Sequence, residues 1–123
     1  MLNNHLYTVV CSEKQETLYY VEVALNPENI IYKSHFPGKP ITPGVCIIQM
    51  LKELVEMIKK QSYMIFEVKN VKFLKIIDPI ENSPIDFFIA LIDEKGILHV
   101  SAEIKREEET FARLILFLSE SHA

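Results

Sequence analysis

One stretch of the chain, residues 34–58, constrains the fold more than any other. It places a histidine, His35, in a loop that contains three prolines and two glycines: Pro37, Gly38, Pro40, Pro43 and Gly44. Proline fixes φ, and glycine allows conformations or close approaches that a side chain would forbid. An apolar segment without a helix breaker follows, so we predict a helix from Pro43 or Gly44 to about Lys60. The sequence therefore predicts a histidine on stiff backbone beside a helix N-terminus, whose unpaired N–H groups carry partial positive charge.

The rest of the chain has the alternating and β-branched patterns of strands. We predict a hairpin of two strands closed by a polar Ser12–Glu16 segment, then four more strands; the ranges are 6–11, 17–25, 65–77, 85–92, 97–106 and 110–118. The run Leu114–Leu118 is apolar on both faces, which is typical of a central, covered strand. One long helix against an antiparallel sheet predicts an α+β layer pair in a single domain over residues 1–123.

The composition narrows the classes of function. The chain has 123 residues, 49% of them hydrophobic, and a formal charge of −4, which argues against nucleic acid as the main partner. No apolar run has the length of a membrane span, and the N-terminus does not resemble a signal peptide, so we expect a cytosolic protein without a membrane partner. Cys11 and Cys46 are expected to be reduced thiols, and neither forms a metal-binding motif with a histidine.

The segment His35–Val45, HFPGKPITPGV, resembles the HFPGxPxxPGV signature of FabZ-type 3-hydroxyacyl-[acyl-carrier-protein] dehydratases. A weaker similarity covers Val71–Glu81, where Pro79 matches but Ile80 and Glu81 stand in place of a glycine and an aspartate. The resemblance implies the hot-dog fold, in which a curved antiparallel sheet wraps around one central helix. It also implies a homodimer, or a multiple of dimers, because active sites of the family lie between two subunits.

One departure from the family concerns its second catalytic residue. The family has a glutamate there, or an aspartate in FabA-type relatives, whereas this chain has Gln49. Glu53 lies one helical turn further on, where many relatives have glutamine. Three interpretations stay open: Glu53 supplies the acid, His35 acts alone as base and then acid, or the protein binds acyl chains without dehydrating them. Glu53 could also belong to a solvated polar stripe, as helix carboxylates commonly do.

The resemblance assigns roles to other residues. The backbone N–H groups of Gly44 and Val45 would hold the thioester carbonyl, and Phe36 would contact the substrate. A basic group would hold the acyl carrier protein and its phosphopantetheine, unless its members are ordinary exposed lysines of a sheet: Lys69, Lys72 and Lys75. No metal or organic cofactor is expected.

The sequence therefore predicts a lyase that converts 3-hydroxyacyl-carrier thioesters into trans-2-enoyl thioesters, in fatty-acid-like or polyene biosynthesis. A hot-dog acyl thioesterase is an alternative, with Glu53 activating water. A non-catalytic acyl-binding subunit that partners an active dehydratase is another, and Gln49 is the residue that favours it.

Overall fold

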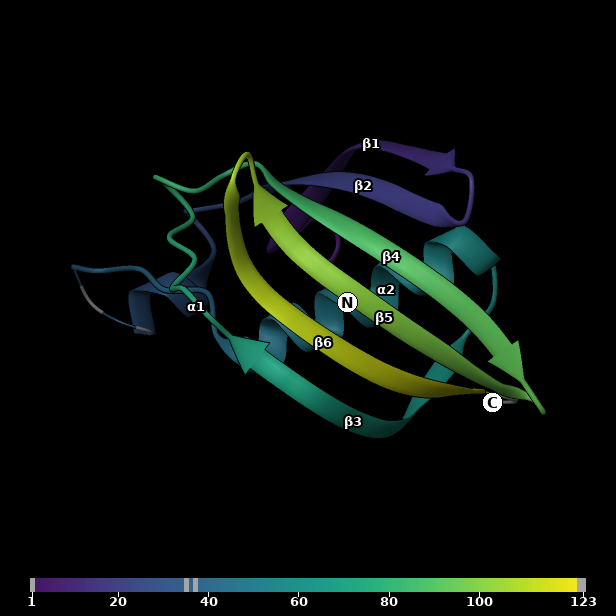
Figure 1. Cartoon of the computed structure of the whole chain (residues 1–123). Helices are drawn as coiled ribbons and strands as arrows, with labels where there is room; N and C mark the ends of the chain where they lie inside the picture. Colours follow the sequence, from purple (N-terminus) through teal and green to yellow (C-terminus); the bar gives the residue numbers. More distant parts are fainter. Residues whose placement is uncertain (1, 35, 37, 122–123) are drawn as a thin grey trace.

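The computed structural model describes residues 2–34, 36 and 38–121 of the chain. Two helices and six strands follow one another in the order β1 (Tyr7–Gln15), β2 (Leu18–Leu25), α1 (Ile30–Ser34), α2 (Gly44–Lys59), β3 (Tyr63–Phe73), β4 (Ile85–Glu94), β5 (Ile97–Arg106) and β6 (Glu109–Glu120). The strands form one antiparallel sheet in the order β1-β2-β4-β5-β6-β3 (Figure 1).

The sheet curves around α2, which lies against its concave face (Figure 1). The apolar face of α2 supplies Ile47, Leu51 and Leu54 to the core, and each is almost fully buried. The strands contribute every second side chain to the same core, as Val21 and Val23 do in β2. The expected α+β hot-dog arrangement, with one central helix and a sheet wrapped around it, is confirmed.

The helix boundaries agree with the prediction. Pro43 is extended, with φ −63° and ψ 145°, and α2 begins at the next residue. Lys60 ends the helix in the left-handed conformation, with φ 54°, and its N–H donates to the carbonyl of Glu56. The Pro-Gly pair therefore starts the long helix where the sequence indicates.

The first hairpin is longer than predicted. We expected a polar connection over Ser12–Glu16, but β1 continues to Gln15, which pairs with Leu18 of β2. Because β1 is an edge strand, polar and charged side chains can continue its ladder while facing solvent. Glu16, with φ 55°, makes the sharp turn instead.

Strand β3 ends earlier than predicted, at Phe73 rather than near Ile77. The N–H groups of Leu74 and Lys75 both donate to the carbonyl of Phe111, after which the chain leaves the sheet. Ile77 is fully buried, and its carbonyl accepts a hydrogen bond from the N–H of Thr42 at 2.9 Å. Residues 74–77 therefore pack beside the loop that leads into α2.

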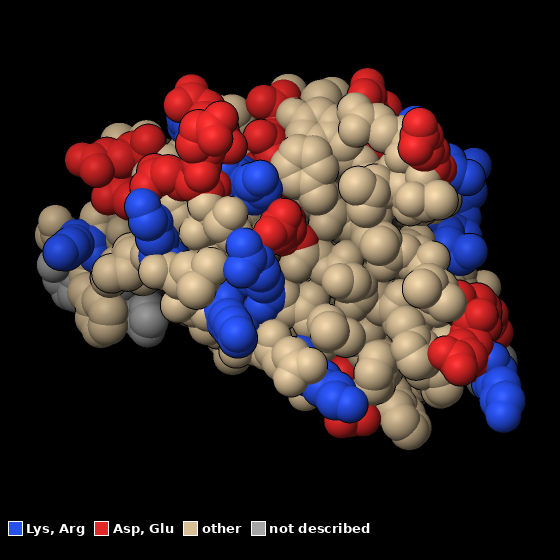
Figure 2. Space-filling model, in the orientation of Figure 1, with Lys and Arg blue, Asp and Glu red and all other residues tan. Residues whose placement is uncertain are grey.

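The last strand, β6, is central, as predicted, because it lies between β5 and β3. Its inner side chains Leu114, Leu116 and Leu118 are buried, but Ile115 and Phe117 on the outer face stay partly exposed. We predicted a strand that is covered on both faces, but in a single chain only the inner face of β6 is fully covered. Figure 2 shows this outer face as a broad area with few charged atoms. No helix among the described residues is long and apolar enough to cross a membrane.

Candidate functional site

The N-terminus of α2 is held by a buried threonine. Thr42 is only 4% exposed, and its hydroxyl hydrogen-bonds the hydroxyl of Tyr32 at 2.9 Å. Its N–H donates to the Ile77 carbonyl at the same distance. The loop is thereby fixed to α1 on one side and to the segment after β3 on the other, which sets the direction in which the first turn of α2 points.

The first N–H groups of α2 are available to a ligand. The N–H groups of Cys46 and Ile47 donate to the Pro43 carbonyl, at 3.0 and 3.2 Å. Those of Gly44 and Val45 have no acceptor among the described residues, as is usual for a helix start. A hollow of about 300 Å³ lies beside Gly44, bounded by residues 41–44, Ile47 and residues 73–77. Two N–H donors beside an apolar hollow can polarise a carbonyl whose acyl chain enters the hollow.

Gly44 packs closely against the ring of Phe73. A Cβ atom at this position would lie 2.7 Å from two ring carbons of Phe73. The ring is about half exposed, at 49%, so it could move away. The absence of a side chain at Gly44 therefore lets Phe73 form one wall of the hollow.

We expect Gly44→Ala to push the Phe73 ring out of place and to lower thermal stability by about 1 kcal/mol, the lower end of the usual cost of overpacking. Binding of an acyl thioester should weaken as well, because the hollow loses its wall. When Phe73→Ala is already present, adding Gly44→Ala should cost no further stability, because the ring that would clash is gone. Thermal unfolding of the two single variants and the double variant measures this. Purely additive effects would contradict this contact.

The loop before α2 contains a tight turn. The N–H of Phe36 donates to the carbonyl of Lys39 at 3.2 Å, and the N–H of Lys39 donates back at 3.0 Å. Gly38 has φ +78°, a value that the third position of a type II turn requires. The predicted base, His35, lies outside the described residues, between the last residue of α1 and this turn in the sequence. Its catalytic role stays a prediction, as does the contact of exposed Phe36 with substrate.

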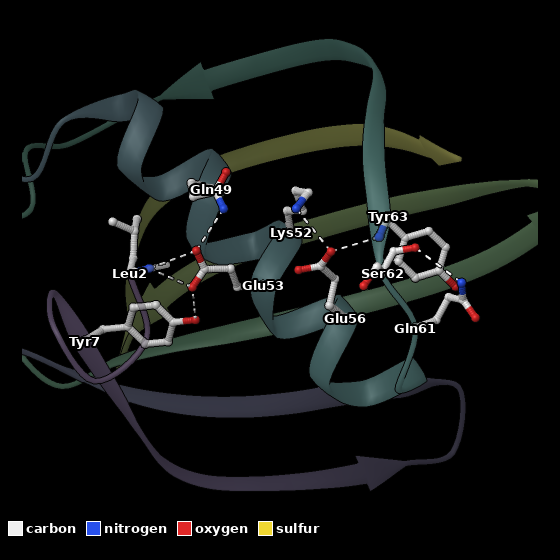
Figure 3. Close-up of polar contacts among 9 residues, drawn as sticks. All are labelled: Leu2, Tyr7, Gln49, Lys52, Glu53, Glu56, Gln61, Ser62 and Tyr63. Carbon is white, nitrogen blue, oxygen red and sulfur yellow. Dashed lines mark hydrogen bonds and ion pairs between the residues drawn. The ribbon is translucent and has the colours of Figure 1, made fainter. Parts of the chain in front are cut away.

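Glu53 is the most heavily hydrogen-bonded side chain of the helix (Figure 3). Its carboxylate accepts from the N–H groups of Leu2, at 3.0 and 3.2 Å, and of Asn3, at 3.0 Å. The Tyr7 hydroxyl donates to it at 3.1 Å and the Gln49 amide at 2.8 Å. Glu53 is 5% exposed, so it does not belong to a solvated stripe. It instead fastens the N-terminal segment to the central helix.

These contacts decide the charge of Glu53. Burial raises the pKa of the carboxyl, but the donors from Leu2, Gln49, Tyr7 and Asn3 outweigh burial and lower the pKa below its ordinary value of 4.5. The group is therefore an ionised acceptor at neutral pH. An ionised carboxylate without a spare proton is unsuited to act as general acid.

At low pH, protonation of Glu53 should weaken its hydrogen bonds to the N-terminal segment. Because the folded pKa of Glu53 is lowered, its stabilising contribution is present above pH 4.5 and is lost as pH falls through the folded pKa. We expect the unfolding free energy of the wild type to fall in this window, and the amide resonances of Leu2 and Asn3 to shift. Glu53→Gln should lack this part of the pH dependence. Parallel stability curves for the two proteins down to about pH 3 would contradict the assignment.

A second helix carboxylate, Glu56, was not singled out by the sequence. It accepts from the Lys52 ammonium at 3.1 Å and from the N–H of Tyr63 at 2.8 Å (Figure 3). The bond to Tyr63 ties the last turns of α2 to the start of β3. Cys46 is buried, and burial raises the pKa of its thiol, so it is a packing residue rather than a thiolate. Among the described residues, no three His, Cys, Asp or Glu side chains lie together as a metal site.

The three lysines proposed for carrier binding are all exposed. Lys69 lies over the Phe117 ring, with Nζ 5.8 Å from the ring centre. Lys75 forms an ion pair with Glu109. Lys72 lines a shallow groove on the outer face of the sheet. They therefore do not form one compact cluster, and their role in carrier binding stays a prediction.

Comparison with known proteins identifies the family of this chain. The family model for the ApeI dehydratase matches residues 11–113, most of the chain. A curated relative, the 3-hydroxyacyl-[acyl-carrier-protein] dehydratase FabZ of Clostridium acetobutylicum, is 27% identical over 122 residues, which cover 85% of this chain and 86% of that protein.

Two solved structures show how widely the fold is shared. A chain of the dehydratase heterocomplex ApeI:P from Xenorhabdus doucetiae superposes with a TM-score of 0.73 and 18% identity, covering 91% of this chain and 96% of that one. A hypothetical thioesterase from Streptococcus pneumoniae, solved with coenzyme A, gives 0.64 and 6%, covering 94% and 88%. At these identities the superpositions show the fold alone. The match along the sequence goes further, and by it this chain belongs to the ApeI-like dehydratase family.

Proposed function

We propose that the protein dehydrates 3-hydroxyacyl thioesters carried by acyl carrier protein to trans-2-enoyl thioesters. The observation that carries this proposal is the pair of unused N–H groups, of Gly44 and Val45, beside an apolar hollow at the end of the signature loop. A thioester carbonyl bound there is polarised, which acidifies the adjacent carbon. Family membership supports dehydration as the reaction.

The two proton transfers are both assigned to His35. As base, its imidazole takes the proton from the carbon next to the carbonyl while Gly44 and Val45 hold the developing oxyanion. As the imidazolium, it returns that proton to the departing hydroxyl, so the products are the enoyl thioester and one water. Gln49 cannot supply a proton, but its amide can hydrogen-bond the hydroxyl or the water. This scheme needs no acid from Glu53, which we assign a structural role.

No metal or organic cofactor has a part in this scheme. We propose that the acyl chain arrives on the phosphopantetheine of acyl carrier protein, whose acidic surface would meet Lys69 and Lys72. Lys75 is less suited to this contact because Glu109 already neutralises it. The cytosolic location and the pathway served, whether fatty-acid-like or polyene, stay predictions.

We propose a homodimer formed through the edge strand β3. The edges of the sheet are β1 and β3. Strand β3 exposes four large apolar side chains in its first half: Met64, Ile65, Phe66 and Val68. Such an edge pairs readily with another strand. The other end of β3 lies beside the candidate site, since Phe73 lines the hollow, so a partner strand that ran along all of β3 would also approach the site.

Phe66→Lys should convert the dimer into monomers, because it places a charge in an apolar strand interface. The loss of one buried aromatic anchor costs about 2 kcal/mol or more, which is about 30-fold in the dissociation constant. Val10→Lys on the opposite edge is the matched control, since Val10 is 56% exposed and Phe66 64%. Light scattering should show monomers for the first variant and dimers for the second. A wild-type monomer at micromolar concentration would contradict the interface.

The two alternatives give different products. A thioesterase would release free thiol from acyl thioesters, and the fold of the Streptococcus pneumoniae protein is compatible with this. The hydrogen bonds that surround Glu53 disfavour its use in activating water. A non-catalytic subunit would be inactive alone and active when mixed with a related dehydratase; the heterocomplex of Xenorhabdus doucetiae suggests such an assembly.

One incubation with 3-hydroxyacyl-carrier protein separates these functions. A gain of enoyl absorbance without free thiol supports the dehydratase. Release of thiol would support the thioesterase, and no product without a partner subunit would support the non-catalytic role.

A further inference from the structure

The hollow at the start of α2 has a closed floor and an open mouth. Its floor is formed by Ile47 and Ile77, which are 3% and 1% exposed and therefore face the core rather than solvent. Phe73, Leu74 and Ile76 also line the hollow, but each is about half exposed, so they form its mouth. A chain that enters through the mouth must therefore end where it meets Ile47 and Ile77.

The two polar side chains of the lining, Thr42 and Lys75, already have partners. The hydroxyl of Thr42 hydrogen-bonds the hydroxyl of Tyr32, and the ammonium of Lys75 forms an ion pair with Glu109. The remaining lining side chains are apolar. The hollow therefore suits an aliphatic chain whose far end carries no polar group.

Two larger hollows among the described residues are more polar. One of about 330 Å³ lies beside the second half of α2 and is lined by Glu53, Glu56 and Lys60. The other, of about 510 Å³, lies on the outer face of the sheet and is lined by Lys72 and Arg113. An aliphatic chain in either hollow would displace water from charged groups without replacing its hydrogen bonds. The hollow at the start of α2 is therefore the one suited to an acyl chain.

The volume of this hollow limits how much of a chain it can hold. A water molecule takes up about 30 Å³ of the liquid, and a methylene group is of similar size, so about 300 Å³ holds at most about ten carbons. A longer chain must either push into the packed core behind Ile47 and Ile77 or leave its end in water.

We propose that Ile47 and Ile77 determine the length of the acyl chain, because they close the hollow to linear chains longer than about ten carbons. Each methylene that leaves water for the hollow favours binding, whereas a chain that is too long gains nothing from its last carbons. This limit rests on the proposed function, since the thioester carbonyl is placed at Gly44 and Val45 and the chain in the hollow.

A series of unreactive acyl chains measures the limit without requiring turnover. The probes are linear, saturated acyl pantetheines of about four to sixteen carbons in which an amide replaces the thioester, titrated by calorimetry. In the wild type, affinity should rise by up to about fourfold per added methylene. The rise should break at about ten carbons, after which affinity stays level or falls.

Substitutions of the floor should move this break. Ile47→Ala and Ile77→Ala each remove three carbon atoms, and each should move the break to chains about two carbons longer, because the space left collapses only in part. The matched control is Ile89→Ala in β4, since Ile89 is fully buried but does not line the hollow. It should lose similar stability and keep the wild-type break. Ile47→Val serves if the alanine variants do not fold, with a break about one carbon longer.

The outcomes are distinct from those of the activity assay. Affinity that rises steadily to the longest chain, absence of binding to any chain, or a break that does not move in the folded floor variants would overturn the inference. A dehydratase that gives one of these results would keep the proposed function and lose only the limit at Ile47 and Ile77. A protein that shows the break and its shift, but no dehydration, would keep the limit and reject the proposed function instead.

Discussion

His35→Ala is expected to lower kcat/KM for a 3-hydroxyacyl-carrier substrate by about 10²–10⁴-fold or more. This is the usual range for one general acid–base group. The loss should reach or exceed the upper end, because the same imidazole takes the proton from carbon and returns it to the hydroxyl. The stability of the variant should change little, since the loop is shaped by its prolines, by Gly38 and by the hydrogen bonds of Phe36 with Lys39.

The matched control is His99→Ala on β5. His99 stacks on Phe117, with ring centres 4.4 Å apart, and its Nε2 lies 3.8 Å from a carboxylate oxygen of Glu94. It lies on the outer face of the sheet, whereas the helix start and its hollow lie elsewhere. Its removal should leave kcat/KM within a few-fold of the wild type. Equal losses in both variants would contradict a specific role for His35.

Gln49→Glu should produce the second large effect, a gain of about 10²-fold in dehydration, the lower end of a general acid contribution. The new carboxyl would face the Glu53 carboxylate across the present contact of 2.8 Å. Two negative charges at that distance repel each other strongly. The pair therefore keeps one proton, and its second apparent pKa is raised. The donors from Leu2, Asn3 and Tyr7 favour the charged form of Glu53, so we expect that proton on the new carboxyl at position 49.

The sign of the pH dependence follows from the raised pKa. Below it the pair keeps its proton, so the gain in rate is retained, and this gain is lost as the pH rises through the raised pKa. The stability is fully present only below the ordinary carboxyl pKa of the unfolded chain, and it is lost relative to the wild type as the pH rises from there through the raised pKa. The exchanged double variant, Gln49→Glu/Glu53→Gln, has one charge and one amide again, so its stability should follow the wild type at high pH. If Gln49→Glu changed neither the activity nor the pH dependence of stability, residues 49 and 53 would not interact as described.

The signature loop and the helix were predictable because their signals are local. Pro43 and Gly44 determine the start of α2 within a residue, through the fixed φ of proline and the missing side chain of glycine. Val21 and Val23 lie on one face of β2, as the period of a strand requires, and both are buried. These features depend on residues close together in the sequence, so the sequence pattern alone was enough to predict them.

The role of Glu53 was not predictable in the same way. By spacing it belongs with Lys52 and Glu56 on the polar side of a helix, but it is buried and the N-terminal segment donates hydrogen bonds to it. Two of its donors are the backbone N–H groups of Leu2 and Asn3, which any residue types would supply. A contact between backbone and a side chain about 50 positions away leaves no mark in the sequence.

The extent of the edge strand was missed for a related reason. Polar residues are typical of turns, and the charged end of β1 resembles one. The ladder with β2 continues to Gln15 because an edge strand needs only one hydrogen-bonded neighbour and tolerates polar side chains on both faces.

We propose that this chain, by itself, interconverts 3-hydroxyacyl and trans-2-enoyl thioesters on a carrier protein. The most direct test starts from each of the two thioesters separately and follows the carrier protein by mass spectrometry for the loss or gain of one water. The wild type should bring both reactions to the same equilibrium mixture, whereas His35→Ala should leave both starting materials unchanged over the same time. Failure of the wild type to convert either thioester, or equal conversion by His35→Ala, would contradict it.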